Sequence, residues 1–524
     1  MIKNPVLTGF NPDPSILYHD ETFYIATSTF EYFPGVKIAA SKDLANWETV
    51  CYPLNTHKLL DMRGNLKSCG IWAPCLSWSN GLFYLVYTDV KSWCQKPYKD
   101  TPNYITTAKD IKGPWSDPVY INSSGFDPSL FHDDDGRKYF VNMEWDYRKM
   151  KTVGDEGEQF SGILITELDP ITLEKISKPV KVYKGTDRKL VEAPHIYKKD
   201  GYYYLFTAEG GTQYAHTQTV ARSKELYGEY ENHPDLYLIC AKEAYKQIGQ
   251  GKLQKTGHGS IAQAKDGRWW FAFLCGRPLE GTEFCPLGRE TSINEIIWEN
   301  GWPYLKNKTQ VADVEFEGYG EKVPAQKIEY DFGSEKFKLD FQTPRTFPKY
   351  EVANGTLKLY GGDSPVSNFS QGMLVRRQTE FSFEAQTSLT LHANNFQQMA
   401  GLVYRYDERT HYYLRVSRDD DGKPTLGLIC MDAWNFSMPI PEIALDEGKI
   451  HMKLCVDKLE GKFSYSTDGV NFTEIPYRID VTTLSDDYAD PLGFTGAYVG
   501  MLSVDMNDKT SWADYHSFSY TPKE

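Results

Sequence analysis

The chain has 524 residues, which is long for one hydrophobic core, so we expect at least two domains. Its formal net charge of −14, with no basic stretch to offset it, excludes a nucleic-acid-binding role. Apolar residues make up 40% and aromatic residues 14%, typical of a globular protein rich in aromatic surface. Such aromatics favour β-structure or a sugar-binding face, and β-structure is the simpler explanation.

The N-terminal stretch MIKNPVLTGFNPDPS lacks the basic region and apolar core of a signal peptide, and no later run is long enough to span a membrane. Nine cysteines occur without a CxxC pair or a Cys/His ligand spacing. Free thiols in a reducing compartment explain this pattern better than disulfides or a zinc site. We therefore expect a cytoplasmic protein without a membrane partner.

One sequence unit occurs five times before residue 305, at intervals of 54 to 66 residues. Each copy begins with a characteristic dipeptide and continues through an apolar run and a polar turn into a second run rich in aromatics. The dipeptides are Asp13-Pro14, Ala73-Pro74, Asp127-Pro128, Ala193-Pro194 and His258-Gly259. Asn-Gly and Asp-Gly turns are strong hairpin signals, although the first copy has Asp20-Glu21-Thr22 there. Repeated hairpins predict a five-bladed β-propeller, in preference to a β-sandwich with accidental similarity between hairpins.

The innermost strands of a propeller line its axis, so equivalent repeat positions should converge on one cavity. These positions include Asp13, Asp127 and His258, with Trp72 and Glu192 one step earlier in their copies. Cleavage of a glycosidic bond needs one carboxylic acid to protonate the leaving oxygen and a second carboxylate to act on water or on the sugar carbon. When carboxylates cluster, their mutual repulsion raises the pKa of one of them. A single Asp at a strand start is better explained as a turn cap, but three carboxylates in register favour catalysis.

Seven sequence motifs carry a resemblance to a known family over essentially the whole chain. They are NPVLTGFNPDPSI from Asn4, ATSTFEYFPGV from Ala26, WAPCLSW from Trp72, SSGFDPSLFHDDDG from Ser123, KGTDRKLVEAPHIY from Lys184, CGRP from Cys275 and FCPLGRET from Phe284. The sequence resembles the two-domain β-xylosidases of glycoside hydrolase family 43. It departs from the usual motif at Ala193, where the family commonly has glycine.

The resemblance implies Asp13 as general base and Glu192 as general acid, with Asp127 tuning the pKa of the acid and orienting it. It also implies inversion of anomeric configuration in a single displacement. A water must then fit beside the sugar, so the carboxyls of Asp13 and Glu192 should lie about 6.5 to 9.5 Å apart rather than about 5 to 5.5 Å.

Supporting roles follow from the same resemblance. Arg289 should reach the sugar hydroxyls, which we favour over a structural ion pair. Trp72 and Phe30 should form aromatic walls of the pocket, although a core role explains Phe30 nearly as well. His258 lies on the axis by repeat register. No cofactor is required: Ca²⁺ or Mg²⁺ near His258 is an option in this family, but one histidine without a second protein ligand gives no reason to expect a metal.

The second half of the chain has a different pattern. Residues 306–326 mix turn residues and charges and are predicted to be a linker between a catalytic propeller at 1–305 and a second domain at 327–524. Short alternating runs separated by Asp, Gly and Asn turns predict an antiparallel, jelly-roll-like β-sandwich there. The resemblance identifies this as a concanavalin-like domain. In relatives an aromatic from such a domain closes the pocket, and FTGAYVG at Phe494–Gly500 suggests Tyr498 for that position, unless its hydroxyl points to solvent.

A pocket closed on one side accepts only a chain end. The expected reaction is therefore release of xylose from the non-reducing end of β-1,4-xylo-oligosaccharides, which are small enough to be imported into the cytoplasm. Xylopyranose and arabinofuranose can present similar hydroxyl positions, so we expect a secondary α-L-arabinofuranosidase activity. The alternative is that α-L-arabinofuranosidase is the primary activity. Less favoured alternatives are a non-catalytic carbohydrate-binding propeller and a retaining fructosidase or invertase. A homo-oligomer is expected, with a subunit number that the sequence does not define.

Overall fold

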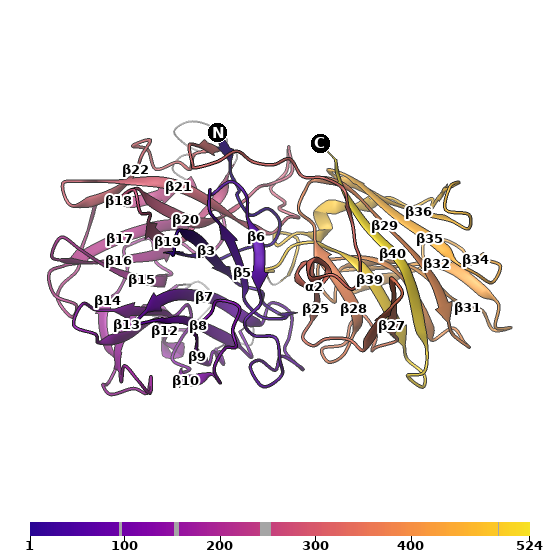
Figure 1. Cartoon of the computed structure of the whole chain (residues 1–524), viewed down its shortest axis with the longest axis horizontal. Helices are drawn as coiled ribbons and strands as arrows, with labels where there is room; N and C mark the ends of the chain where they lie inside the picture. Colours follow the sequence, from indigo (N-terminus) through magenta and orange to yellow (C-terminus); the bar gives the residue numbers. More distant parts are fainter. Residues whose placement is uncertain (94–96, 151–156, 242–252, 491, 524) are drawn as a thin grey trace.

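The computed structural model describes residues 1–93, 97–150, 157–241, 253–490 and 492–523. These residues form a β-propeller and a β-sandwich side by side, which confirms the predicted all-β fold (Figure 1). The described segments hold a single α-helix, α2 (Glu335–Asp340), and the Ser334 side chain caps its N-terminus by accepting from the backbone N–H of Phe337. None of the helices in the described ranges is long and apolar enough to cross a bilayer.

The propeller contains five four-stranded antiparallel blades. Blade one contains β2 (Ser15–His19), β3 (Thr22–Thr27), β5 (Lys37–Ser41) and β6 (Glu48–Cys51), and blade two contains β7 (Gly70–Ser79), β8 (Leu82–Val90), β9 (Asn103–Ala108) and β10 (Val119–Asn122). Blade three contains β11 (Ser129–His132), β12 (Lys138–Trp145), β13 (Phe160–Leu168) and β14 (Val180–Tyr183), and blade four contains β15 (Glu192–Lys199), β16 (Tyr202–Glu209), β17 (Thr217–Ser223) and β18 (Glu231–Cys240). Blade five contains β19 (Gln254–Gln263), β20 (Trp269–Gly276), β21 (Arg289–Glu299) and β22 (Trp302–Leu305). Each blade is one copy of the sequence repeat.

The first strand of each blade lies innermost, because β2, β7, β11, β15 and β19 contact one another around the axis. Side-chain hydroxyls link neighbouring inner strands. Ser260 donates to the carbonyl of Pro14 at 3.0 Å, and Ser129 donates to the carbonyl of Pro194 at 2.5 Å. These bonds satisfy backbone carbonyl groups in the interior of the propeller. The repeat dipeptides therefore surround one channel.

The N-terminus and the predicted linker close the ring of blades together. β1 (Ile2–Lys3) pairs with β23 (Glu315–Phe316), which lies inside the segment 306–326. The Asn4 side chain donates to the carbonyl of Ile293 at 2.7 Å. The segment predicted as a linker thus packs on the propeller through backbone pairing.

Two antiparallel sheets form the sandwich. The first contains β24 (Ile328–Glu329), β26 (Tyr350–Ala353), β27 (Thr356–Tyr360), β29 (Ser382–His392), β35 (Ile450–Asp457), β36 (Glu460–Ser466), β37 (Thr473–Glu474), β38 (Ile479–Asp480) and β40 (Trp512–Lys523). The second contains β4 (Tyr32–Phe33), β25 (Phe341–Pro344), β28 (Gly372–Arg377), β30 (Gln398–Arg405), β31 (His411–Arg418), β32 (Pro424–Asp432), β33 (Asn435–Ser437), β34 (Ile443–Ala444) and β39 (Tyr498–Asp505). The described residues also form two short 3₁₀ helices, η1 (Tyr147–Lys149) and η2 (Val481–Leu484).

One strand of the sandwich comes from the propeller half of the sequence. β4 extends the second sheet by pairing with β25, Thr343 opposite Phe33 and Pro344 opposite Tyr32. One hydrophobic cluster continues across the boundary and includes Phe30 and Trp72 from the propeller with Val375 and Tyr498 from the sandwich. The two domains therefore share a core beside the channel.

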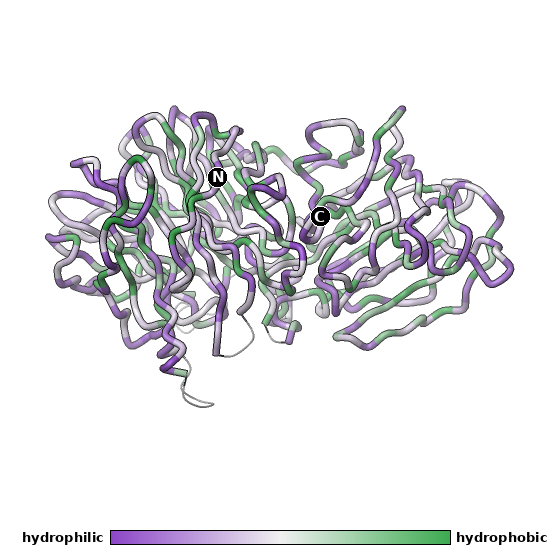
Figure 2. Tube along the Cα trace, turned by 90° about the horizontal axis from the view of Figure 1, so that it is seen from below, coloured by the Kyte–Doolittle hydropathy of each residue, from purple (hydrophilic) through white to green (hydrophobic). Residues whose placement is uncertain are grey.

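Polar and apolar residues are distributed as this architecture requires. Figure 2 shows hydrophilic stretches at many outer loops of both domains. The eight cysteines among the described residues are all free thiols, and the ninth, Cys94, lies outside the described residues.

Candidate active site

The five repeat dipeptides share an uncommon backbone conformation. Their first residues have positive φ angles: 55° at Asp13, 32° at Ala73, 52° at Asp127, 52° at Ala193 and 47° at His258. Non-glycine residues rarely adopt this left-handed conformation, which persists only where surrounding structure holds it. Strand pairing shifts register at the same place in three blades, between Trp72 and Cys75, Glu192 and His195, and Gly257 and Ser260. Such bulges re-aim side chains, here at the same depth of these three blades.

Asp13 lies at the centre of a polar cluster. Its Oδ2 accepts a 2.6 Å hydrogen bond from the Ser28 hydroxyl, and its Oδ1 accepts a 3.3 Å bond from Nη1 of Arg289. Nδ1 of His258 lies 3.6 Å from the same Oδ1. A carboxylate has about four acceptor sites, so Asp13 retains capacity for a water molecule. The predicted convergence of Asp13 and His258 is present, and Arg289 joins them.

Glu192 and Asp127 are buried beside Asp13 and interact with each other and with it. Burial, followed by the charge of Asp13, raises the pKa of Glu192 to about 8, while the Arg289 and Lys99 charges oppose the rise. Burial also raises the pKa of Asp127 well above its usual value, followed by repulsion from Glu192 and Asp13. At neutral pH this cluster keeps a proton on a carboxyl group, as a general acid requires.

Arg289, the first residue of β21, contacts both domains. Its Nη1 donates to the Thr212 hydroxyl at 2.9 Å as well as to Asp13, and its Nη2 donates to the carbonyl of Phe494 at 2.9 Å. Its guanidinium also lies 5.3 Å from the ring centre of Phe30 and 5.2 Å from that of Phe494. Cation–π contacts of this kind hold a buried guanidinium between rings.

Four aromatic rings form a cluster beside the carboxylates. Phe30 lies 5.8 Å from Trp72 and 5.6 Å from Phe494, and Phe494 lies 5.4 Å from Trp72 and 4.7 Å from Trp93. Phe494 is only partly buried and brings a ring of the sandwich domain against Arg289 and Trp72. Aromatic rings offer an apolar surface for the C–H face of a sugar.

The prediction of Tyr498 as the pocket-closing aromatic is wrong, and Phe494 holds that place. Tyr498 is 0% exposed and cannot touch a substrate. Its ring stacks on Tyr32 at 3.9 Å and lies 6.2 Å from Phe10, inside the shared core. Tyr498 begins β39, whose side chains in this region are directed into the sandwich and its boundary, whereas Phe494 belongs to the loop before the strand.

The described side chains around His258 do not by themselves form a ligand set for a divalent cation. In the parts of the chain that the structure describes, no three His, Cys, Asp or Glu side chains gather closely enough to hold a metal ion. His258 and Asp13 supply one imidazole and one carboxylate beside the positive charge of Arg289. Calcium prefers about six to eight oxygen ligands and magnesium about six, so we derive no step through a cation.

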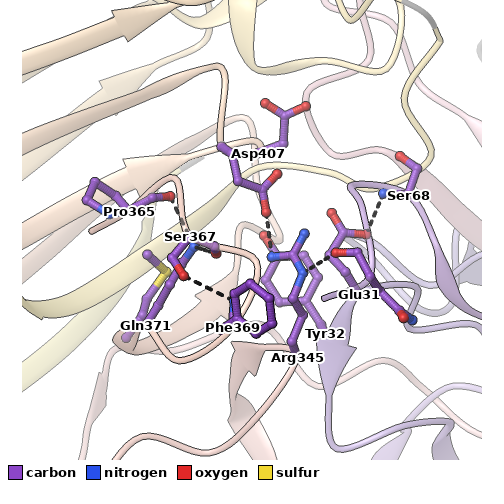
Figure 3. A network of polar contacts seen from close by, with 12 residues as sticks. Glu31, Tyr32, Ser68, Arg345, Pro365, Ser367, Phe369, Gln371 and Asp407 are labelled. Atoms are coloured by element: carbon purple, nitrogen blue, oxygen red, sulfur yellow. Dashed lines mark hydrogen bonds and ion pairs between the residues drawn. The ribbon is translucent and has the colours of Figure 1, made fainter. Parts of the chain in front are cut away.

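A buried network joins the segment next to Phe30 to the sandwich, and Figure 3 shows its residues Glu31, Ser68 and Arg345. Trp72 donates from Nε1 to the carbonyl of Ser68 at 2.8 Å, and the backbone N–H of Ser68 donates to Oε2 of Glu31 at 3.0 Å. The backbone N–H of Arg345 donates to the carbonyl of Glu31 at 2.7 Å, and Nη1 of Arg345 lies 2.5 Å from Oε1 of Glu408. This network fixes the segment that carries Phe30 and the start of β7, which carries Trp72.

Sequence reasoning missed three further residues of the site. Thr212 and Asp486 contact Arg289, at 2.9 Å and 3.8 Å, and Phe494 covers it. The motif that contains Tyr498 also contains Phe494, so the signal for the correct aromatic was present. Nothing in the local sequence marks Thr212 or Asp486.

Comparison with known proteins agrees with this geometry. Residues 2–303 match the family model for glycosyl hydrolases family 43, and residues 329–521 match the model for the beta xylosidase C-terminal concanavalin A-like domain. The two matches correspond to the propeller and the sandwich.

Individual relatives match over the full length of the chain. The sequence is 44% identical to a xylosidase/arabinosidase 43B of Humicola insolens, over 99% of this chain and 98% of that protein. It is 41% identical to a beta-xylosidase of Bacillus subtilis, over 100% of each. The crystal structure of a xylan beta-1,4-xylosidase from Bacillus halodurans C-125 superimposes with a TM-score of 0.94, at 41% identity and over 100% of both chains. The chain therefore belongs to glycosyl hydrolases family 43.

Proposed function

We propose that the protein is an inverting, exo-acting β-xylosidase that releases xylose from the non-reducing end of β-1,4-xylo-oligosaccharides. The observation that carries this proposal is the group of three buried carboxyls, Asp13, Asp127 and Glu192, beside an aromatic cluster closed by Phe494 of the sandwich. The names of the full-length relatives, xylosidases and a xylan beta-1,4-xylosidase, support the choice of sugar.

In the proposed mechanism, Glu192 donates its proton to the glycosidic oxygen as the bond to the leaving group breaks. Asp13 accepts a proton from the water that attacks the anomeric carbon from the opposite face. Arg289 and Ser28 hold Asp13 in position, and Phe30, Trp72 and Phe494 supply apolar surface for the sugar ring. Asp127 interacts electrostatically with Glu192 and transfers no proton to or from the substrate.

Exo-cleavage is supported by the position of Phe494. Its ring lies within 6 Å of Phe30, Trp72 and Trp93, and its backbone carbonyl accepts from Arg289. A site bounded in this way accommodates a chain end. Digestion of xylotetraose should release xylose as the first product, and early release of xylobiose would refute exo-action.

Arabinofuranosidase activity is the second candidate, favoured by the name of the Humicola insolens relative. Comparison of kcat/KM on 4-nitrophenyl β-D-xylopyranoside and 4-nitrophenyl α-L-arabinofuranoside decides between the two. We predict the higher value for the xyloside. A higher value for the arabinofuranoside would make xylosidase the secondary activity, and no turnover of either would refute the proposal.

A metal-independent reaction in the cytoplasm completes the proposal. The set of side chains around His258 does not suit Ca²⁺ or Mg²⁺, and the free thiols among the described cysteines suit a reducing compartment. Dialysis against a chelator should leave kcat unchanged. Loss of activity that Ca²⁺ or Mg²⁺ restores would contradict metal independence. Cell fractionation tests the proposed cytoplasmic location. The predicted homo-oligomer is tested by light scattering.

A further inference from the structure

Arg289 has one contact that the proposed chemistry does not use. Its Nε lies 3.8 Å from Oδ2 of Asp486, a residue of the sandwich domain. Both side chains are buried, with Arg289 5% and Asp486 3% exposed. Nε has no hydrogen-bond partner of its own. The charge of Asp486 therefore faces the edge of the guanidinium that points away from Asp13.

Asp486 is held firmly on its own side. Its Oδ1 accepts a 2.5 Å hydrogen bond from the Tyr406 hydroxyl, which in turn accepts a 3.3 Å bond from the backbone N–H of Thr495. The same Tyr406 oxygen would lie 1.8 Å from a Cβ atom placed on Gly493, so only glycine permits this approach. The loop that carries Phe494 and the carboxylate of Asp486 are thus fixed by one tyrosine.

The loop after η2 also contacts the propeller next to Arg289. Asp487 lies 2.5 Å from Nζ of Lys255 and accepts from the backbone N–H of Cys285 at 3.1 Å. Burial raises the pKa of Asp486 to about 7, and the charges of Arg289 and Lys255 oppose the rise. A substantial share of molecules therefore carries the Asp486 charge near neutral pH.

We propose that Asp486 is a positioning residue for the active site, by which the sandwich domain sets the orientation of Arg289 toward Asp13 and the sugar. A carboxylate at one edge of a guanidinium fixes the direction of its remaining donors, because the fork is planar and rigid. The donors at Nη1 and Nη2 then reach Asp13, Thr212 and the Phe494 carbonyl. The sandwich thereby completes the catalytic site of the propeller. This inference rests on the proposed xylosidase function.

Asp486→Asn tests the proposal with little change of shape. Asparagine keeps an oxygen for the Tyr406 hydroxyl but removes the charge that faces Arg289. The affinity for xylose, measured by calorimetry, and kcat/KM on the aryl xyloside should each fall about tenfold or more, as for other losses of orientation in a site. The matched control is Asp487→Asn in the same loop, which should lower the melting temperature and keep both values within about twofold. Equal losses in the two variants would mean that only loop integrity matters, which would overturn the proposal.

A double-mutant cycle asks whether Asp486 acts through Arg289. In an Arg289→Lys background, Asp486→Asn should cause no further loss of xylose affinity, because the oriented fork is already gone. If the two substitutions each reduce xylose affinity by an independent factor, the proposal is overturned.

A crystal structure of Asp486→Asn tests the proposal without a measurement of activity. We expect the guanidinium to leave its 3.3 Å contact with Asp13. An unmoved Arg289 would refute the inference about Asp486. By contrast, a wild-type protein that neither binds xylose nor cleaves the aryl xyloside would refute the proposed function.

Discussion

Ser28 donates a 2.6 Å hydrogen bond from its hydroxyl to Oδ2 of Asp13. The Ser28 hydroxyl oxygen also accepts a 2.7 Å bond from the backbone N–H of Ala73, so Ser28 joins the first two blades beside the proposed base. Ser28→Ala removes one donor from Asp13 and leaves a buried N–H of Ala73 without a partner. We expect kcat to fall about tenfold and stability to fall by about 1 to 3 kcal/mol. Steady-state kinetics and thermal melts measure the two effects.

Ser15→Ala is the matched control for this change. The Ser15 hydroxyl accepts from the backbone N–H of Leu76 at 3.0 Å and is likewise buried between the first two blades. This variant should lose similar stability and retain kcat. If both variants retain full kcat, the hydrogen bond to Asp13 has no catalytic role.

Glu192→Gln removes the proposed acid without changing the size of the side chain. Hydrolysis of xylobiose should fall by about 10² to 10⁴-fold, because its leaving group needs protonation. A 2,4-dinitrophenyl xyloside, whose leaving group departs as an anion, should lose far less. In the wild type, activity should fall as pH rises through about 8, where Glu192 loses its proton. Equal losses on both substrates would exclude Glu192 as the acid.

Asp127→Asn should shift the alkaline limb of the pH–rate profile to lower pH. The Glu192 charge helps to raise the pKa of Asp127. In an interacting pair of carboxyl groups, the ionised partner favours protonation of the other. Neutral asparagine removes that repulsion, so the pKa of Glu192 should fall and kcat at neutral pH should fall with it. The profile of kcat/KM against pH measures the shift. An unaltered profile with full activity would reduce Asp127 to a turn residue.

As pH rises from 5 to 8, the free energy of unfolding of Glu31→Gln should increase relative to that of the wild type. Burial, followed by the charge of Glu408, raises the pKa of Glu31 from 4.5 to about 7. Below the lower value the carboxyl is protonated in both folded and unfolded chains. Between the two values the folded chain holds the extra proton, so stability falls with rising pH, by about 1 to 3 kcal/mol. Glutamine does not titrate, so the variant lacks this pH-dependent loss of stability.

Melting temperatures of both proteins across this pH range provide the test. Glu48→Gln, at an exposed position, serves as control and should show a difference from wild type that does not change with pH. A constant difference for Glu31→Gln as well would show that Glu31 is ionised throughout the range.

The repeat made much of this site predictable from the sequence. Aligned dipeptides placed Asp13, Asp127 and His258 at one depth, and the structure gives all of them positive φ angles and brings Glu192 beside them. A repeat transfers information between blades, since each copy must adopt the same inner strand. The propeller fold and the convergence of its carboxylates follow from that periodicity.

Contacts between the domains were not predictable in the same way. Phe494 and Tyr498 belong to one motif, and the choice between them depends on where β39 begins at the domain boundary. The 3.8 Å approach of Asp486 to Arg289 depends on how the sandwich docks on the propeller. No local pattern or spacing in a single sequence specifies such docking.

The stereochemistry of the first product tests the central claim most directly. If Asp13 activates water while Glu192 protonates the leaving group, ¹H NMR during hydrolysis of an aryl β-xyloside will show α-xylose first, with β-xylose appearing only by mutarotation. β-Xylose as the first product would require a covalent intermediate on a carboxylate and would contradict the account.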